Sequence, residues 1–194
     1  MAKVYQEYQK AANRHLKTCI ELRNIISKLS EKPEINKKLI KNVTEDLYYL
    51  SGYIIECSCC MLIYFNFDIS SKKDLKATKI GHCLENIAFT KPQKEEVTDD
   101  KTLYISNTNH EMRSFQDIYK YLPDIPINTP LINGSLQVFE RANCKDLFFN
   151  WGAEVRYSID ITLTTEKTLK FLEIATNIYT NIDQFVNNPK RKNN

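Results

Sequence analysis

The N-terminal stretch of the chain carries an apolar position at every third or fourth residue, which is the spacing of one face of an α-helix. This pattern predicts a helix over residues 2–30, with polar and charged side chains on its opposite face. Pro33 follows and is expected to end this helix. The apolar positions of the face are Val4, Tyr8, Ala11, His15, Cys19, Leu22, Ile26 and Leu29.

A second helix is predicted over residues 43–66, with Asn42 as its N-cap and Glu45 three residues later in the capping-box position. Its second half is apolar on almost every side, so we expect it to be the central helix of the fold. Gly52 within it predicts a close approach of a neighbouring helix. The core-facing positions are expected to be Leu47, Leu50, Ile54, Cys57, Met61, Leu62 and Phe65.

Weaker patterns follow in the middle of the chain. The polar stretch 91–111 is predicted to be a flexible insertion, in which Leu103, Tyr104 and Ile105 are compatible with a short extended segment. Residues 158–164 alternate between polar and apolar and are also compatible with extended structure. Shorter helices are expected at residues 76–90, 112–121 and 131–148.

The C-terminal pattern predicts a last long helix that is capped by Thr164 or Thr165 and ends near residue 187. Its apolar stripe is expected to consist of Leu169, Leu172, Ala175, Ile178, Tyr179, Ile182 and Val186. Four long helices, short helical inserts and little or no strand predict an all-α fold, which we expect to be an antiparallel helical bundle.

The length of 194 residues predicts a single domain over residues 1–194. We expect the bundle core at about 43–187, with the helix 2–30 packed on it and a disordered basic tail at 188–194. The chain has only four glycines, too few for the many turns of an all-β protein, and this scarcity also favours helices.

Charge and hydropathy exclude some classes of partner. A net charge of +3 is too small to indicate nucleic-acid binding by itself. The apolar run 53–65 contains Glu56 and is shorter than the roughly 20 residues of a membrane span, so no membrane span is predicted.

Of the six cysteines, Cys57, Cys59 and Cys60 are interleaved with apolar residues, and no apolar leader begins the chain. We therefore expect a cytoplasmic protein whose thiols stay reduced and pack in the core. The four glycines are isolated, so no phosphate loop is formed, and no Cys-x-x-Cys pair recurs with zinc spacing. The sequence therefore predicts neither a cofactor nor a metal site.

Candidate chemistry gathers at two places. Glu56 interrupts the apolar run, and a buried carboxylate must be paired, protonated or turned toward water. The segment Trp151-Gly-Ala-Glu-Val-Arg-Tyr157 combines the only tryptophan with Glu154, Arg156 and Tyr157. Two interpretations stay open here, a structural ion pair between Glu56 and Arg156 or a polar pocket in which Arg156 binds a phosphate.

Three segments, taken in order, resemble motifs of the HEPN superfamily. They are Leu50-Ser-Gly-Tyr-Ile-Ile-Glu56, Gly81-His-Cys-Leu-Glu-Asn-Ile87 and Trp151-Gly-Ala-Glu-Val-Arg-Tyr157. The resemblance covers about residues 43–187. It implies a small helical bundle, a homodimer and a role in prokaryotic defence, in a toxin–antitoxin context or in nucleotide metabolism.

The chain departs from HEPN ribonucleases in one motif. Those enzymes carry Arg-x4–6-His, and no arginine of this chain is followed by a histidine at that distance. The resemblance therefore implies a non-catalytic HEPN-like domain that binds a nucleotide, RNA or a partner protein. The residues it assigns to the ligand site are Glu56, His82, Trp151, Glu154, Arg156 and Tyr157.

Within that site the resemblance implies separate roles. Arg156 would hold a phosphate, Trp151 or Tyr157 would stack on a base, and His82 would donate a hydrogen bond. The alternative hypothesis is a metal-independent endoribonuclease toxin with a dispersed site. In that hypothesis His82 acts as general acid or base and Arg156 stabilises the phosphorane.

Overall fold

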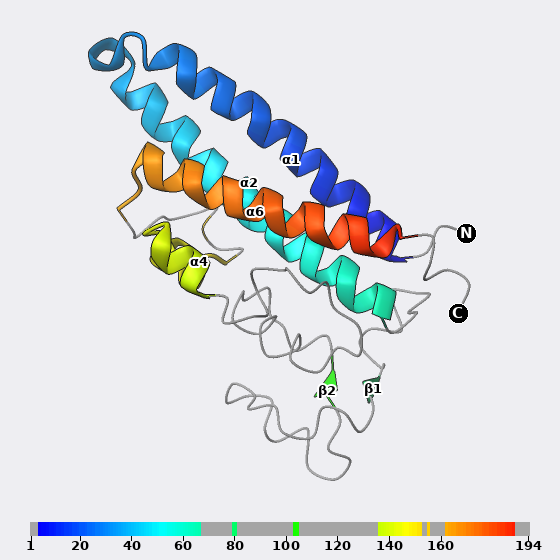
Figure 1. Ribbon diagram of the computed structural model, residues 1–194. Coiled ribbons are helices and arrows are strands. Elements are labelled where there is room, and N and C mark those ends of the chain that lie inside the picture. Colours follow the sequence, from blue (N-terminus) through cyan, green and yellow to red (C-terminus); the bar gives the residue numbers. More distant parts are fainter. Residues whose placement is uncertain are drawn as a thin grey trace.

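The computed structural model describes residues 4–66, 79–80, 103–104, 136–152, 155 and 162–188. Most of this part is helical (Figure 1), which confirms the predicted all-α class. The helices are α1 (Val4–Leu29), α2 (Pro33–Asn66), α4 (Leu136–Arg141), α5 (Lys145–Phe149) and α6 (Thr165–Val186). Two short strands, β1 (Lys79–Ile80) and β2 (Leu103–Tyr104), pair antiparallel with Lys79 opposite Tyr104.

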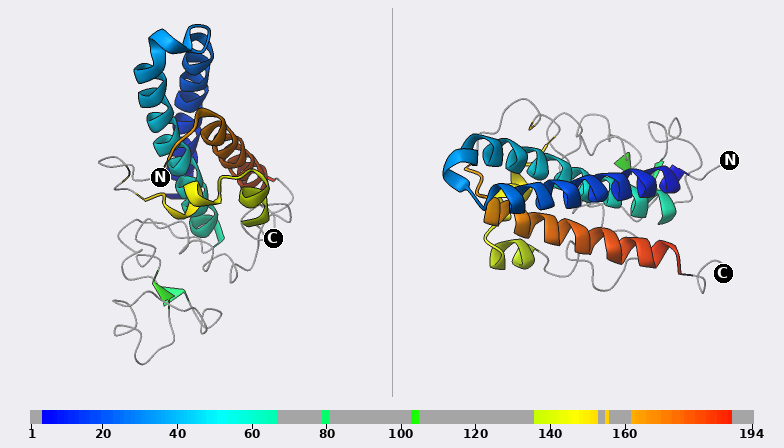
Figure 2. Two further views of the ribbon diagram at one scale, coloured as in Figure 1. Left: turned by 90° about the vertical axis from the view of Figure 1, so that its left-hand side faces the viewer. Right: turned by 90° about the horizontal axis from the view of Figure 1, so that it is seen from above.

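The helices α1 and α2 form an antiparallel hairpin, and α6 lies along the second half of α2 (Figures 1 and 2). Thr44 and Thr165 are joined through their hydroxyl groups at 3.1 Å, and Phe65 meets Phe185 at 6.0 Å between ring centroids. The first contact joins the start of α6 to the first half of α2, and the second joins the ends of both helices, so α6 runs parallel to α2. The prediction of a purely antiparallel arrangement is therefore wrong for this pair of helices.

Helix α2 is the centre of the fold, as its apolar second half predicted. Nearly every side chain from Ser51 to Tyr64 is buried, because α1 covers one side of the helix and α6 another. By length and composition, helix α2 could cross a membrane, but 78% of its apolar 18-residue segment is buried inside the protein. Burial against protein therefore accounts for its apolar composition.

One end of the three-helix unit is closed by rings from all three helices. Tyr5 of α1 meets Phe65 of α2 edge to face at 5.5 Å, and Phe65 meets Phe185 of α6. Beside these rings, Gln9 Nε2 donates to Asp183 Oδ1 at 2.6 Å and joins α1 to α6. These contacts fix the register of α1 and α6, which run antiparallel.

The boundary between the first two helices differs from the prediction. Helix α1 ends at Leu29 as expected, but α2 begins at Pro33 and includes Asn42, which is therefore no N-cap. Proline fits the first turn of a helix, where its missing N–H group has no intrahelical acceptor. Asn36 Nδ2 also donates to the Leu29 carbonyl at 3.1 Å, which ties the start of α2 to the end of α1.

The predicted helix 131–148 is interrupted within the described part. Asn143 adopts φ 54°, in the left-handed region that asparagine tolerates better than most residues, and separates α4 from α5. Residues 79–80 are a strand, so the helix predicted over 76–90 is wrong at these positions, whereas the extended conformation expected at Leu103 and Tyr104 is confirmed. The rest of 76–90 and of the insertion 91–111, the helix 112–121 and the tail beyond residue 188 lie outside the described residues.

Helix α6 confirms the C-terminal prediction closely. Thr164 is its N-cap in an extended conformation, and its hydroxyl accepts a hydrogen bond from the Lys167 backbone N–H at 3.3 Å. Every position of the predicted apolar stripe is buried or partly buried, and none is exposed. The same holds for the predicted stripe of α1.

Candidate functional site

The single tryptophan packs onto the middle of α2. Trp151 is 3% exposed and lies against Gly52, where a Cβ atom would overlap the indole ring. Its Nε1 donates to the Tyr49 carbonyl at 3.1 Å, and its ring meets Tyr53 edge to face at 5.0 Å. We call Tyr49, Gly52, Tyr53 and Trp151 the Trp151 seat. Gly52 thus allows the close approach that the sequence predicted, although the neighbour is an indole ring and not a second helix.

The seat continues through aromatic rings into α1. Tyr53 stacks on His15 with 5.5 Å between ring centroids and an interplanar angle of 27°. Burial, and secondarily the positive charge of Arg14, lowers the pKa of His15 below its ordinary value. The neutral imidazole is therefore favoured, as expected for a core histidine.

Glu56 lies on the same face of α2 as the seat. It follows Gly52 by four residues, about one helical turn, and is 6% exposed. Burial raises the pKa of the Cys57 thiol to about 12, and the charge of Glu56 adds to this increase. The same two causes raise the pKa of Cys60. The structure therefore brings Trp151 to the face of α2 that carries Glu56.

The other predicted site residues, His82, Glu154, Arg156 and Tyr157, lie outside the described residues. Trp151 has its N–H bonded to a backbone carbonyl and almost no exposed surface. A ring in this state has no free face for a base, so Trp151 serves packing.

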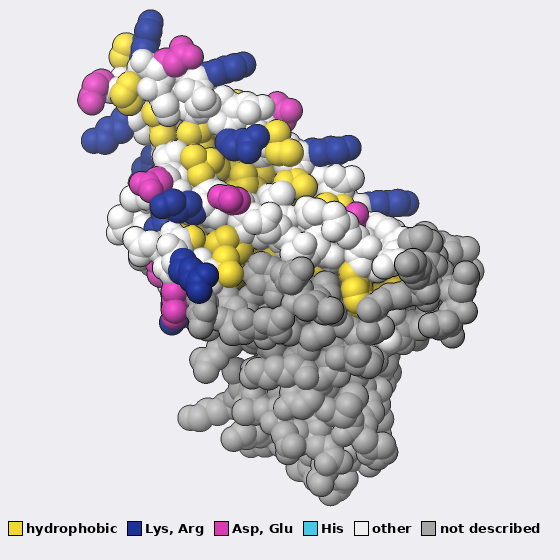
Figure 3. All heavy atoms as spheres, viewed as in Figure 1, with side chains coloured by type: hydrophobic (Ala, Val, Ile, Leu, Met, Phe, Trp, Pro, Cys, Tyr) yellow, Lys and Arg dark blue, Asp and Glu magenta, His cyan; other side chains and the backbone are white. Residues whose placement is uncertain are grey.

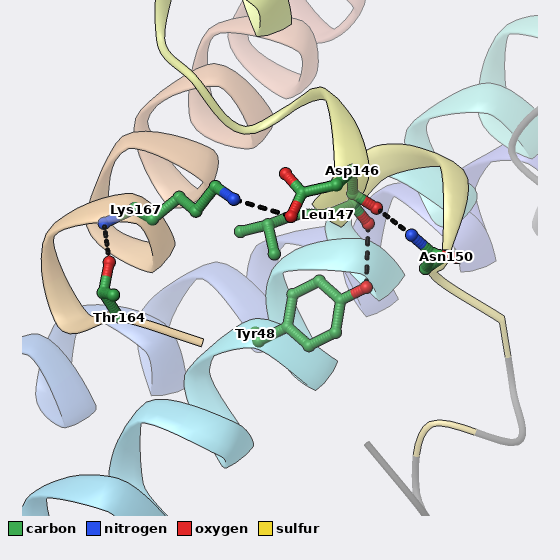
Figure 4. Close-up of polar contacts among 6 residues, drawn as sticks. All are labelled: Tyr48, Asp146, Leu147, Asn150, Thr164 and Lys167. Carbon is green, nitrogen blue, oxygen red and sulfur yellow. Dashed lines mark hydrogen bonds and ion pairs between the residues drawn. The ribbon is translucent and has the colours of Figure 1, made fainter. Parts of the chain in front are cut away.

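A polar anchor that the sequence did not predict holds the segment before Trp151 (Figure 4). Tyr48 Oη donates to the Leu147 carbonyl at 2.8 Å, and Lys167 Nζ donates to Asp146 Oδ2 at 2.6 Å. Asn150 Nδ2 donates to the Asp146 carbonyl at 2.8 Å and closes the end of α5. These bonds tie α5 to both α2 and α6, which places Trp151 over Gly52.

A groove between α1 and α6 is the second unpredicted feature. Its volume is about 480 Å³, and Leu16, Ile20, Leu169 and Leu172 supply most of its apolar lining. Arg23 of α1 and Glu166, Lys170 and Glu173 of α6 add charged groups of both signs. Figure 3 shows the band of hydrophobic side chains that runs between the two helices, with charged side chains along its edges. We call this feature the α1–α6 groove.

The five described cysteines are free thiols, and four of them are buried. Burial raises the pKa of Cys19 and of Cys144 to about 11. A thiol with a raised pKa carries little thiolate at neutral pH and is a poor nucleophile or metal ligand. These two thiols are therefore packing groups, as the sequence indicated.

Comparison with known proteins found no matching family model, no matching curated protein and no matching solved structure. The resemblance to the HEPN superfamily therefore stays a prediction that rests on three short segments. Of these, Leu50–Glu56 lies in α2 and contributes Gly52 and Tyr53 to the Trp151 seat.

Proposed function

We propose that this chain is a HEPN-like helical-bundle domain that acts without catalysis, by binding a partner protein in the cytoplasm as a homodimer. One observation supports a binding role most directly. The α1–α6 groove offers an apolar lining and charged edges, whereas Glu56 and Trp151 are buried on one face of α2. Open apolar surface favours association, and buried site residues favour a structural role.

The finer fold that we propose is a bundle of four long helices. Helices α1, α2 and α6 are the three long helices that the described residues supply to this bundle. The long connection from α2 to α6 explains why these two helices run parallel, since a parallel pair requires a crossover along the length of the bundle.

The alternative that we retain is an endoribonuclease with a dispersed site. His82 would act as general acid or base and Arg156 would stabilise the phosphorane. The RNA would then bind in the same region as Glu56. The absence of Arg-x4–6-His from the sequence supports the non-catalytic proposal over this one.

The deciding experiment is cleavage of a labelled mixed RNA pool by the purified protein. His82→Ala and Arg156→Ala are compared with His110→Ala and Arg113→Ala, which replace the same residue types outside the predicted site. The non-catalytic proposal expects no cleavage by any of the five proteins. Cleavage that disappears in the first two variants and persists in the two controls would make the chain a nuclease and reject the proposal.

Nucleotide binding is tested separately with the same proteins. Titration calorimetry with nucleoside mono-, di- and triphosphates measures binding directly. Saturable binding that is lost in Arg156→Ala but kept in Arg113→Ala would make a nucleotide the ligand of this domain. Heats of dilution alone would leave protein–protein association as its role.

A further inference from the structure

The α1–α6 groove has a basic edge and an acidic edge. Arg23 stands on the α1 side, while Glu166 and Glu173 stand on the α6 side. Glu166 already pairs with Lys170 at 2.7 Å. No ion pair joins Arg23 or Glu173 to another side chain in the ranges that the structure describes. The α1 edge therefore has a positive charge, that of Arg23, and the α6 edge has a negative charge, that of Glu173, with which a partner can pair.

The apolar lining of the groove is also incompletely covered. Ile20 is 36% exposed, and Leu16 and Leu169 are only partly buried. Leu172 at 4% exposure forms the deepest part of the lining. An apolar strip between two edges of opposite charge is suited to a helix that offers the same strip with the charges exchanged.

This chain itself carries such a surface. The hydrogen bond between Gln9 and Asp183 sets the register of α1 against α6 and puts Arg23 level with Leu169, between Glu166 and Glu173. A twofold axis parallel to the helices keeps that level and places α1 of one copy opposite α6 of the other. The basic edge of each copy then meets the acidic edge of its partner, twice by symmetry.

We infer that two copies of this chain associate face to face through their α1–α6 grooves, with Ile20 of each copy entering the groove of the other. Arg23 of each copy pairs across the interface with Glu173 of the second copy. The inference rests on the proposed homodimer and adds the surface, the symmetry and the charge pairs. Charge pairs at such an edge select this alignment over the one in which α1 faces α1, because like charges would then meet.

The test is the dissociation constant of the dimer, measured by analytical ultracentrifugation of the full chain over a wide concentration range. Arg23→Glu and Glu173→Arg are each expected to raise this constant at least tenfold. The double variant exchanges the two charges and is expected to return it to within about threefold of the unmodified protein. Far-UV circular dichroism and thermal melting confirm that all three variants fold.

Lys38→Glu and Glu34→Arg are the matched controls. Both reverse an exposed charge on α2 away from the groove and are expected to leave the constant unchanged. Ile20→Ser removes the apolar contact without adding charge and is expected to raise the constant about tenfold.

Three outcomes would overturn the inference, and only the second of them also rejects a part of the proposed function, the homodimer. A dimer that is insensitive to Arg23→Glu, Glu173→Arg and Ile20→Ser would keep the homodimer but reject the groove as its interface. A protein that remains monomeric at every concentration would reject the homodimer as well. A double variant no better than the single ones would reject the paired charges. RNA cleavage, measured separately, decides the question of catalysis.

Discussion

The Trp151 seat and the α1–α6 groove differ in how completely their side chains are buried, hydrogen-bonded or ion-paired. At the seat, the Trp151 ring is 3% exposed, touches Gly52 and donates its N–H to a carbonyl. In the groove, Ile20 is 36% exposed and Arg23 has no ion-pair partner in the described ranges. Groups that are already packed and bonded stabilise the fold, whereas groups that are not can still gain free energy from a partner. The first region therefore holds the protein together, and the second is available for association.

The largest loss of stability is expected when a side chain fills the space between Gly52 and Trp151. Gly52→Leu is expected to lower the free energy of unfolding by about 2–3 kcal/mol, because the new side chain overlaps the Trp151 indole. Leucine has a higher helix propensity than glycine, so the loss cannot come from the helix itself. Urea unfolding followed by circular dichroism measures the change.

The matched control for Gly52→Leu places it in a Trp151→Ala background. Removing the indole removes the overlap, so Gly52→Leu is expected to be neutral or stabilising there. An equal loss of stability in both backgrounds would mean that the indole does not occupy the space above residue 52. The double-mutant cycle isolates this contact from other effects.

A smaller effect is expected from the anchor that positions the seat. Tyr48→Phe removes the buried hydrogen bond to the Leu147 carbonyl and should cost about 1–2 kcal/mol of unfolding free energy. Removing the Lys167–Asp146 pair with Lys167→Met is expected to cost less than about 1 kcal/mol, since that pair is partly exposed. If urea unfolding gave the reverse order, the exposed ion pair and not the buried hydroxyl would hold α5 in place.

The pH dependence of stability tests whether the folded protein holds His15 in its neutral form. Its pKa is lowered in the folded protein, so the unfolded chain binds the proton more readily. Stability is therefore fully present above the unfolded pKa of about 6.5 and is expected to decrease as the pH falls below it. His15→Gln should remove this part of the dependence, which thermal melting between pH 5 and 8 measures. Parallel curves for the two proteins would contradict the assignment.

The smallest effect on folding is expected in the groove. Ile20→Ser should change the unfolding free energy of the monomer by no more than about 0.5 kcal/mol, because the side chain is already 36% exposed. Urea unfolding of dilute protein, below the dissociation constant of the dimer, makes this measurement. A loss comparable to that of Tyr48→Phe would show that Ile20 belongs to the core of the monomer.

The spacing of apolar residues predicted the helices correctly where a helix buries one continuous apolar stripe. The apolar stripes of α1 and α6 and the Thr164 cap follow from local spacing alone, and the structure confirms them. Periodicity failed at Pro33 and Asn143. Proline both ends and begins helices, and a single left-handed asparagine interrupts a helical pattern without altering its hydrophobicity.

Part of the candidate site could also be predicted. Glu56 and Trp151 were singled out as unusual residues, and the structure places both on or against one face of α2. The sequence did not predict that Trp151 would be buried by Gly52, because the two residues lie far apart in the chain. The positions of His82, Glu154, Arg156 and Tyr157 relative to Glu56 stay predictions.

The sequence by itself determined the all-α class, the three long apolar stripes and the central place of α2, since each depends on residues within a few helical turns. Only the tertiary structure decided that α6 runs parallel to α2, that Gly52 receives an indole and that Leu16, Ile20 and Leu169 line an open groove. Local spacing tells which face of a helix is apolar. Which neighbour covers that face, and how completely, is decided by contacts between residues distant in the chain, which the spacing does not contain.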